Sequence, residues 1–121
     1  MEINSSELGK IGEDYAVNYL KNRKFRIIGR NFRQPWGELD IVAVASDKTL
    51  VFVEVKTMRE GELKPEDQMS SSKMKKFKKA ASLYAGRHQD LINDERGWRL
   101  DVIALTKVKN NFVVNHYENV E

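Results

Sequence analysis

The fold is decided by one stretch of the chain, GELDIVAVASDKTLVFVEVKT at residues 37–57. It contains two mostly apolar runs, 38–45 and 50–56, joined by a polar turn at 46–49. Apolar and β-branched runs on either side of a polar turn predict two antiparallel strands. Both faces of the first run are largely apolar, so we expect this strand in the interior of a sheet.

Three charged residues, Asp40, Glu54 and Lys56, interrupt these apolar runs. A charged side chain is costly to bury unless it is paired or binds a metal. Asp40 and Glu54 can share a face only if paired residue numbers sum to an even value such as 94. That register requires an odd-numbered loop or a bulge near 46–49, whereas an even loop would place Asp40 opposite Val55.

If the two carboxylates converge, a cation between them is needed for both to stay ionised cheaply. Oxygen ligands alone favour a hard ion, so we expect Mg²⁺ or Mn²⁺. Lys56 projects with Glu54, near enough to orient or deprotonate a water or to stabilise charge on a phosphate. Glu13, on the inward face of a predicted helix, is a candidate third acid. The alternative is a salt-bridge cluster of Asp40, Glu54 and Lys56.

The whole chain, residues 1–121, is long enough for one domain with one core. Helical spacing of apolar residues predicts a helix from about residue 7 to 22, capped by Ser5 or Ser6. A second helix is expected from Ser71 or Ser72 to about residue 85 after a long loop at 58–72. Further strands are expected at 25–30, 98–106 and 111–117. The predicted order is αβββαββ, an α/β fold.

Basic residues are concentrated in one part of the chain, although the net charge is only +3. Five lysines fall within residues 73–79, which favours a polyanion such as DNA. Lys73 and Lys76 are the leading phosphate-binding candidates. Arg33 and Trp36, just before the acidic strand, are candidates for contacting phosphate and base. The alternatives are a solvated helix face and a packing tryptophan.

Other polar residues exclude several kinds of site. The chain has no cysteine, and His88 and His116 lie far apart, which argues against zinc ligation and disulfides. Asp101 is interpreted as structural, with Arg99 or a helix lysine as its partner. No run is apolar enough to span a membrane, and residues 1–10 lack a hydrophobic signal region. We therefore expect a cytoplasmic protein.

Three motifs carry a resemblance to a known family: GEDYA at 12–16, GELDIVA at 37–43 and LVFVEVKT at 50–57. Together they resemble the YraN-like family of small, uncharacterised bacterial proteins. That family is similar to archaeal Holliday junction resolvases and to the restriction-endonuclease-like nucleases with an Asp and Glu-x-Lys site. The likeness covers almost the whole chain, including the lysine-rich helix and the strand near 99–103.

The resemblance implies a restriction-endonuclease-like mixed central sheet of about five strands flanked by helices. It also implies a divalent-metal site at Glu13, Asp40 and Glu54, with Lys56 as the catalytic lysine. The expected function is metal-dependent hydrolysis of phosphodiester bonds in duplex or branched DNA, including junctions. A homodimer would supply two active sites for cutting both strands. The alternatives are a catalytically silent nucleic-acid-binding module with the same fold and a structural partner-binding protein.

Overall fold

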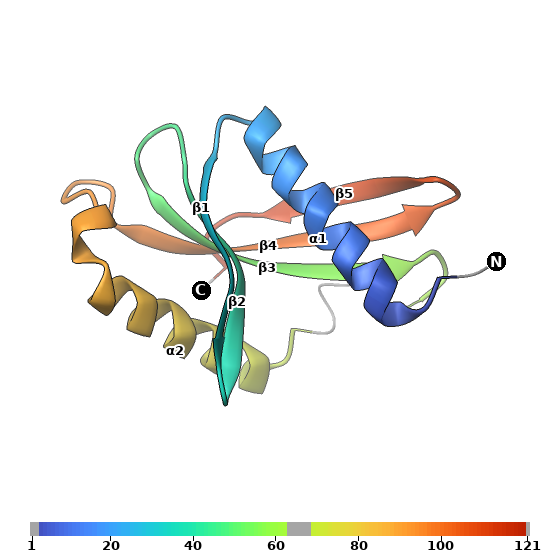
Figure 1. The fold of residues 1–121 in the computed structure, drawn as a ribbon, viewed down its shortest axis with the longest axis horizontal. Helices are drawn as coiled ribbons and strands as arrows, with labels where there is room; N and C mark the ends of the chain where they lie inside the picture. Colours follow the sequence, from blue (N-terminus) through green and yellow to red (C-terminus); the bar gives the residue numbers. More distant parts are fainter. Residues whose placement is uncertain (1–2, 63–68, 121) are drawn as a thin grey trace.

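The computed structural model describes residues 3–62 and 69–120, and its centre is a five-stranded mixed sheet (Figure 1). In chain order the elements are α1 (Ser5–Asn22), β1 (Arg26–Gln34), β2 (Gly37–Val44), β3 (Leu50–Arg59), α2 (Ser71–Arg87), the 3-10 helix η2 (Gln89–Leu91), β4 (Trp98–Val108) and β5 (Asn111–Tyr117). The predicted α/β class and the order αβββαββ are confirmed.

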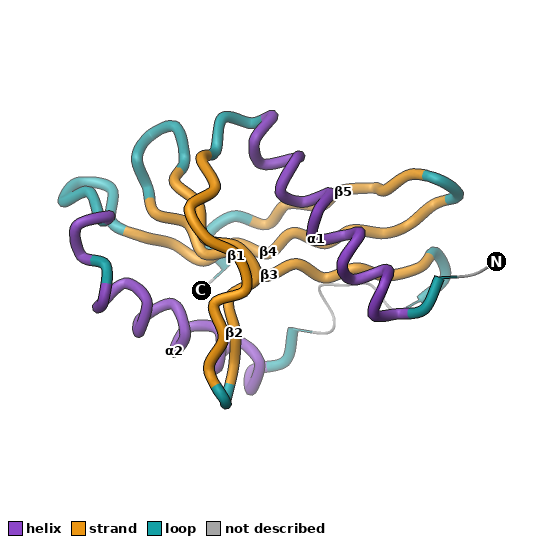
Figure 2. Tube along the Cα trace, in the orientation of Figure 1, coloured by secondary structure: helices purple, strands orange, loops and turns teal. Residues whose placement is uncertain are grey.

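The strands lie side by side in the same order as in the sequence, from β1 to β5. β3 and β4 are parallel, and every other neighbouring pair is antiparallel. A parallel pair needs a crossover between its strands, and α2 supplies it. Figure 2 shows α1 and α2 on different sides of the strands, as expected for a sheet covered on both faces.

Each face of the sheet has its own apolar core, built around one helix. The α1 core is made of Ala16, Val17, Leu20, Ile41, Ala43, Val51, Val53, Ile103 and Leu105. The α2 core is made of Leu39, Val42, Leu50, Phe52, Phe77, Ala80, Ala81, Ala85, Leu100 and Val102. β2, β3 and β4 contribute to both cores, which explains why their sequences are apolar on both faces. No helix in the described part of the chain is long and apolar enough to cross a membrane.

The strand ends differ most from the sequence prediction in β1. We predicted that this strand would end at residue 30 and lead into a polar connection, but it continues to Gln34. Pairing explains the difference, because β1 and β2 remain paired up to Gln34 and Gly37. β3 also runs beyond its predicted end, to Arg59, where it pairs with Lys107 of β4. The predicted loop at 58–72 is therefore shorter, and its residues 63–68 lie outside the described ranges.

The helix caps lie one residue or more before the predicted serines. Asn4 caps α1, and its side chain accepts a hydrogen bond of 2.8 Å from the Glu7 backbone N–H. Ser70 caps α2 in the same way, through the Lys73 backbone N–H. Asn and Ser are both favourable caps, so the sequence alone does not choose among neighbouring polar residues.

Gly12 brings α1 close to β3. A Cβ atom at this position would lie only 3.0 Å from the Cβ of Thr57 and closer still to that residue's Oγ1. Gly9, one turn earlier on the same helix, has open space around it. The close approach at Gly12 therefore sets how α1, and with it the next residue Glu13, lies over the sheet.

We predict that Gly12→Ala lowers the free energy of unfolding by about 1–3 kcal/mol, because the new methyl group overpacks against Thr57. The matched control Gly9→Ala should raise it by up to about 1 kcal/mol, since alanine is the better helix former where space is free. Urea unfolding of both variants measures the difference. Equal effects at the two positions would show that α1 is not fixed at Gly12.

Candidate active site

The β2–β3 hairpin has the register that brings Asp40 toward Glu54. Ile41 pairs with Val53 and Val44 pairs with Leu50, so the paired numbers sum to 94 as predicted. The connection 45–49 has five residues, an odd number, and it is closed by a 2.9 Å hydrogen bond from the Ala45 N–H to the Thr49 carbonyl. The hairpin therefore directs both acidic side chains to one place.

The two strands separate where the acidic residues begin. Pairing between β2 and β3 extends only as far as Ile41, and the Asp40 Oδ2 atom accepts a 2.7 Å hydrogen bond from the Val55 N–H. Leu39 packs in the α2 core with Val42, although regular alternation predicted it on the face of Ile41. The neighbouring Asn31 of β1 has a left-handed φ of 54°. The Asp40 carboxyl thus accepts the Val55 N–H where regular pairing between β2 and β3 has ended.

The Asp40 and Glu54 carboxyl groups are close, buried and electrostatically strained. Asp40 is 8% exposed. Burial, followed by the charge of Glu54, raises the pKa of Asp40 to about 8. Burial also raises the pKa of Glu54, although the ammonium of Lys56 and a hydrogen bond from Asp40 oppose this. The pair therefore shares a proton near neutral pH and behaves as one titrating unit.

Lys56 lies beside Glu54 on the same face of β3. Its Nζ atom is 3.1 Å from the Glu54 Oε1 atom, and the two side chains are 17% and 18% exposed. Lys56 pairs with Glu54, whereas burial and the charge of Glu54 raise the pKa of Asp40. The salt-bridge cluster considered for Asp40, Glu54 and Lys56 is therefore observed only between Glu54 and Lys56.

Glu13 approaches this pair without joining it. Its charge contributes to the raised pKa of Asp40, but its Oε1 atom lies 3.3 Å from the Arg30 guanidinium. Arg30 also contacts Asp14 at 2.7 Å. Across residues 3–62 and 69–120, no three acidic or histidine side chains are grouped closely enough to hold a metal ion. The structure brings Asp40, Glu54 and Lys56 together and leaves Glu13 with Arg30.

A polar pocket of about 620 Å³ opens beside Glu13. Its walls come from α1 and from the β1–β2 hairpin, and they include Arg30, Arg33 and Glu38. The charge of Glu38 also contributes to the raised pKa of Asp40 and of Glu54. The pocket therefore exposes Glu13 and Glu38 to solvent, while Asp40 and Glu54 are not part of its lining.

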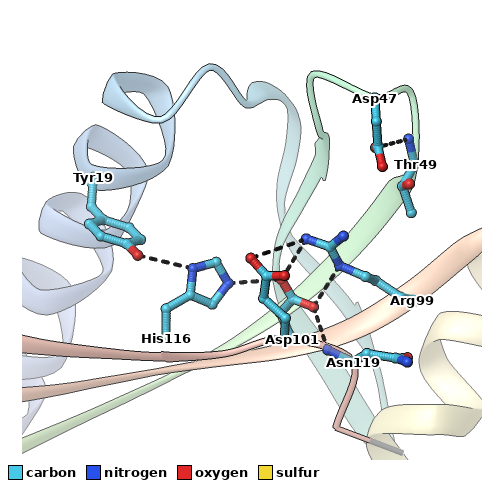
Figure 3. A network of polar contacts seen from close by, with 8 residues as sticks. Tyr19, Asp47, Thr49, Arg99, Asp101, His116 and Asn119 are labelled. Carbon is cyan, nitrogen blue, oxygen red and sulfur yellow. Dashed lines mark hydrogen bonds and ion pairs between the residues drawn. The ribbon is translucent and has the colours of Figure 1, made fainter.

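A second buried aspartate, Asp101 on β4, shows how a carboxylate is satisfied elsewhere in this sheet (Figure 3). It accepts hydrogen bonds from Arg99 at 3.0 Å and from the Asn119 N–H at 3.0 Å, and its Oδ2 atom lies 2.8 Å from the His116 Nε2 atom. Tyr19 of α1 completes the cluster through His116 Nδ1, at 3.1 Å.

These hydrogen-bond partners reverse the effect of burial on the pKa of Asp101. Burial alone would raise the pKa of this carboxyl, but hydrogen bonds from His116, Arg99 and the Asn119 backbone lower it below its ordinary value. The expected ion pair with Arg99 is confirmed. Asp40 is nearly as buried but has no such set of donors, so its pKa is raised whereas the pKa of Asp101 is lowered.

The basic candidates lie on the surface. Lys73 and Lys76 are exposed in the first half of α2. Arg33 is 74% exposed on its side chain and lies 3.4 Å from the exposed Glu38 carboxylate. Side chains with this exposure can change partners at little cost, because exposed ion pairs are weak.

Arg30 and Glu38 were not among the residues predicted for this site. Arg30 lies 17 positions after its partner Glu13, in a different element, so no spacing rule connects them. The prediction that β1 ended at residue 30 also left out residues 31–34, which continue the strand to the Gln34–Gly37 pair. The only signal in the sequence was a polar, strand-compatible run between residues 30 and 38.

The fold and the site define an α/β protein with an aspartate and a Glu-x-Lys motif on adjacent strands. The chain belongs to Uncharacterised protein family UPF0102, the YraN-like family, whose family model matches residues 12–105. It is 35% identical over 116 residues to a UPF0102 protein of Alkaliphilus oremlandii, covering 95% of this chain and 97% of that relative.

Other relatives carry the same description. A UPF0102 protein of Petrotoga mobilis is 39% identical over 109 residues, which are 90% of this chain and 92% of the relative. One of Corynebacterium efficiens is 32% identical over 124 residues, covering 100% and 97% of the two chains. The match therefore extends over the whole fold, including the acidic strands and α2.

We predict that Asp40→Asn stabilises the protein above neutral pH in the absence of metal. The Asp40 pKa rises from 3.8 to about 8 on folding, so the native state holds a proton that the unfolded state releases. Stability then falls as pH rises between these two values. Asparagine removes the charge and keeps an oxygen for Val55, so it should raise the free energy of unfolding by about 1–3 kcal/mol at about pH 9.

Urea unfolding in EDTA at about pH 4 and about pH 9 measures this gain, which should vanish at the lower pH. Glu95→Gln, at an exposed carboxylate, is the control and should show no comparable gain. A variant less stable than the wild type at about pH 9 would mean that the Asp40 charge is already neutralised by protein groups.

Proposed function

We propose that the protein is a divalent-metal-dependent nuclease that hydrolyses phosphodiester bonds in DNA, including branched DNA. The observation that carries this proposal is the Asp40–Glu54 pair, in which a buried carboxyl group contacts a half-buried one at a break in the sheet. Buried like charges are stable together only with a proton or a cation between them. Such strongly shifted groups are concentrated in functional sites.

The residues present fit a hard divalent cation. Asp40 and Glu54 would provide carboxylate oxygens, and Glu13 would be the third ligand once released from Arg30. Oxygen ligands of this kind favour Mg²⁺ or Mn²⁺. When bound, such an ion polarises a phosphoryl oxygen and acidifies a coordinated water.

The chain's own groups supply the remaining chemistry. Lys56, held 3.1 Å from Glu54, is suited to orienting the attacking water and stabilising negative charge on the phosphate. Arg30, once Glu13 turns away, would present a guanidinium to a phosphate in the pocket beside it. Opening the Glu13–Arg30 salt bridge would thus free Glu13 for the metal and Arg30 for the phosphate of the substrate.

DNA is the proposed substrate because exposed basic residues are concentrated on α2, with Arg33 on β1. Lys73, Lys76 and Arg33 are exposed and would neutralise phosphates, and phosphate neutralisation makes the largest contribution to nucleic-acid affinity. A DNA substrate would place the activity in the cytoplasm of a bacterium. Cutting both strands symmetrically would require a homodimer, since one chain contributes one such site.

The second candidate is a nucleic-acid-binding module without turnover. The observation that favours it is the pairing of Glu13 with Arg30 and of Glu54 with Lys56, which leaves no ready three-acid group in the described ranges. This candidate predicts salt-sensitive DNA binding that depends on Lys73 and Lys76 and is indifferent to metal.

We predict that the wild-type protein cleaves at least one of three DNA substrates, linear duplex, flapped duplex or four-way junction, when Mg²⁺ or Mn²⁺ is present. Glu54→Gln should reduce the cleavage rate by about 100-fold or more, because it removes a carboxylate ligand from the metal site and the ion-pair partner of Lys56. Its affinity for DNA in EDTA should change less than about 2-fold, since most of the proposed affinity comes from the exposed residues Lys73, Lys76 and Arg33.

Glu95→Gln, at an exposed position, is the matched control and should cleave at the wild-type rate. DNA binding without metal-dependent cleavage would support the binding module instead. Cleavage that survives Glu54→Gln would point to a contaminating nuclease and refute the proposed active site.

A further inference from the structure

The β1–β2 hairpin extends beyond the rest of the sheet. β1 and β2 stay paired up to Gln34 and Gly37, whereas β2 pairs with β3 only over residues 41–44. Figure 1 shows this two-stranded ribbon projecting away from β3 and β4 toward the first turns of α2. Its tip consists of Pro35 and Trp36.

The ribbon is held against α2. Phe32 meets Tyr84 edge to face, with ring centroids 5.2 Å apart. At the tip, a Cβ atom on Gly37 would lie 3.5 Å from the Cβ of Lys76, which is ordinary van der Waals contact. The tip therefore has a fixed position beside the lysine-rich face of the helix.

Trp36 at this tip is half-buried and has a lysine as its neighbour. The Lys79 Nζ atom lies 4.4 Å from the centre of its ring. Lys73, Lys76 and Lys79 follow one another at intervals of three along α2 and are all exposed. α2 contains no acidic residue from Ser71 to Arg87. An aromatic ring thus stands beside a row of positive charges that complements a phosphate chain.

We propose that this tip binds unpaired nucleotides of DNA, with Trp36 stacking on a base and with Lys76 and Lys79 binding the adjacent phosphates. The inference rests on the proposed function for its choice of DNA, and it adds the recognition of single-stranded or branch-point nucleotides. An aromatic ring stacks on any base whose face is open, and bases inside a uniform duplex offer no open face. Lys79 can exchange the ring for a phosphate, because Lys79 is exposed and a single cation–π contact is weak.

Fluorescence anisotropy in EDTA, where no cleavage occurs, tests this inference with a labelled single strand, a flapped duplex and a plain duplex. Trp36→Ala should weaken binding to the single strand and the flap by about 10-fold and change duplex binding less than about 2-fold. Trp36→Phe should retain most of the affinity, because phenylalanine can still stack.

Trp98→Phe provides both a control and a second readout. Trp98 packs on Phe52 at 5.4 Å between ring centroids, away from the tip, so this variant should bind like the wild type. Trp36 is then the only tryptophan, and its fluorescence should fall when the single strand binds. This readout does not depend on the folding of Trp36→Ala.

Two outcomes separate this inference from the proposed function. If the wild type binds DNA but Trp36→Ala weakens all three ligands equally or none, and Trp36 fluorescence is unchanged, Trp36 is a packing residue and the inference fails alone. If the wild type binds none of the three ligands, the inference and the proposed DNA substrate fail together.

Discussion

The contact between the carboxyl groups of Asp40 and Glu54 is the constraint on which the rest of the site depends. Both groups are largely withdrawn from water, which raises the pKa of each, and the charge of Glu54 raises the pKa of Asp40 further. Lys56 provides one positive charge for two carboxyls. The sheet tolerates a similar burial at Asp101 only by surrounding it with Arg99, His116 and a backbone N–H. Asp40 lacks this set of donors, and burial raises its pKa instead.

The fold maintains this costly contact through ordinary backbone features. The five-residue β2–β3 connection sets the register, and the end of strand pairing at Ile41 leaves the Val55 N–H for the Asp40 carboxyl. Gly12 lets α1 approach β3 closely, which brings Glu13 within electrostatic reach. Apolar cores on both faces provide the stability that offsets the local strain. A destabilised site supported by a well-packed scaffold is typical of functional residues.

Much of this architecture could be predicted from the sequence, because it depends on local patterns. The apolar runs predicted the two strands β2 and β3, and the condition for Asp40 and Glu54 to share a face, an even sum such as 94, is the register observed. Long-range and irregular features could not be predicted. No spacing rule links Arg30 to Glu13, the alternation of β2 breaks at Asp40, and β1 continues through polar residues because β2 pairs with it. The sequence thus predicted that Asp40 and Glu54 could share a face but not that Glu13 would pair with Arg30.

The most direct test of the strained carboxyl pair is a ¹³C NMR titration of the Asp40 and Glu54 side-chain carboxyl carbons, without metal and with saturating Mg²⁺. We expect one carboxyl of the pair to titrate near pH 8 without metal, and Mg²⁺ to move this titration to well below neutral pH. Two carboxyls that both titrate near their ordinary values of about 4, with no response to Mg²⁺, would contradict the proposed metal site.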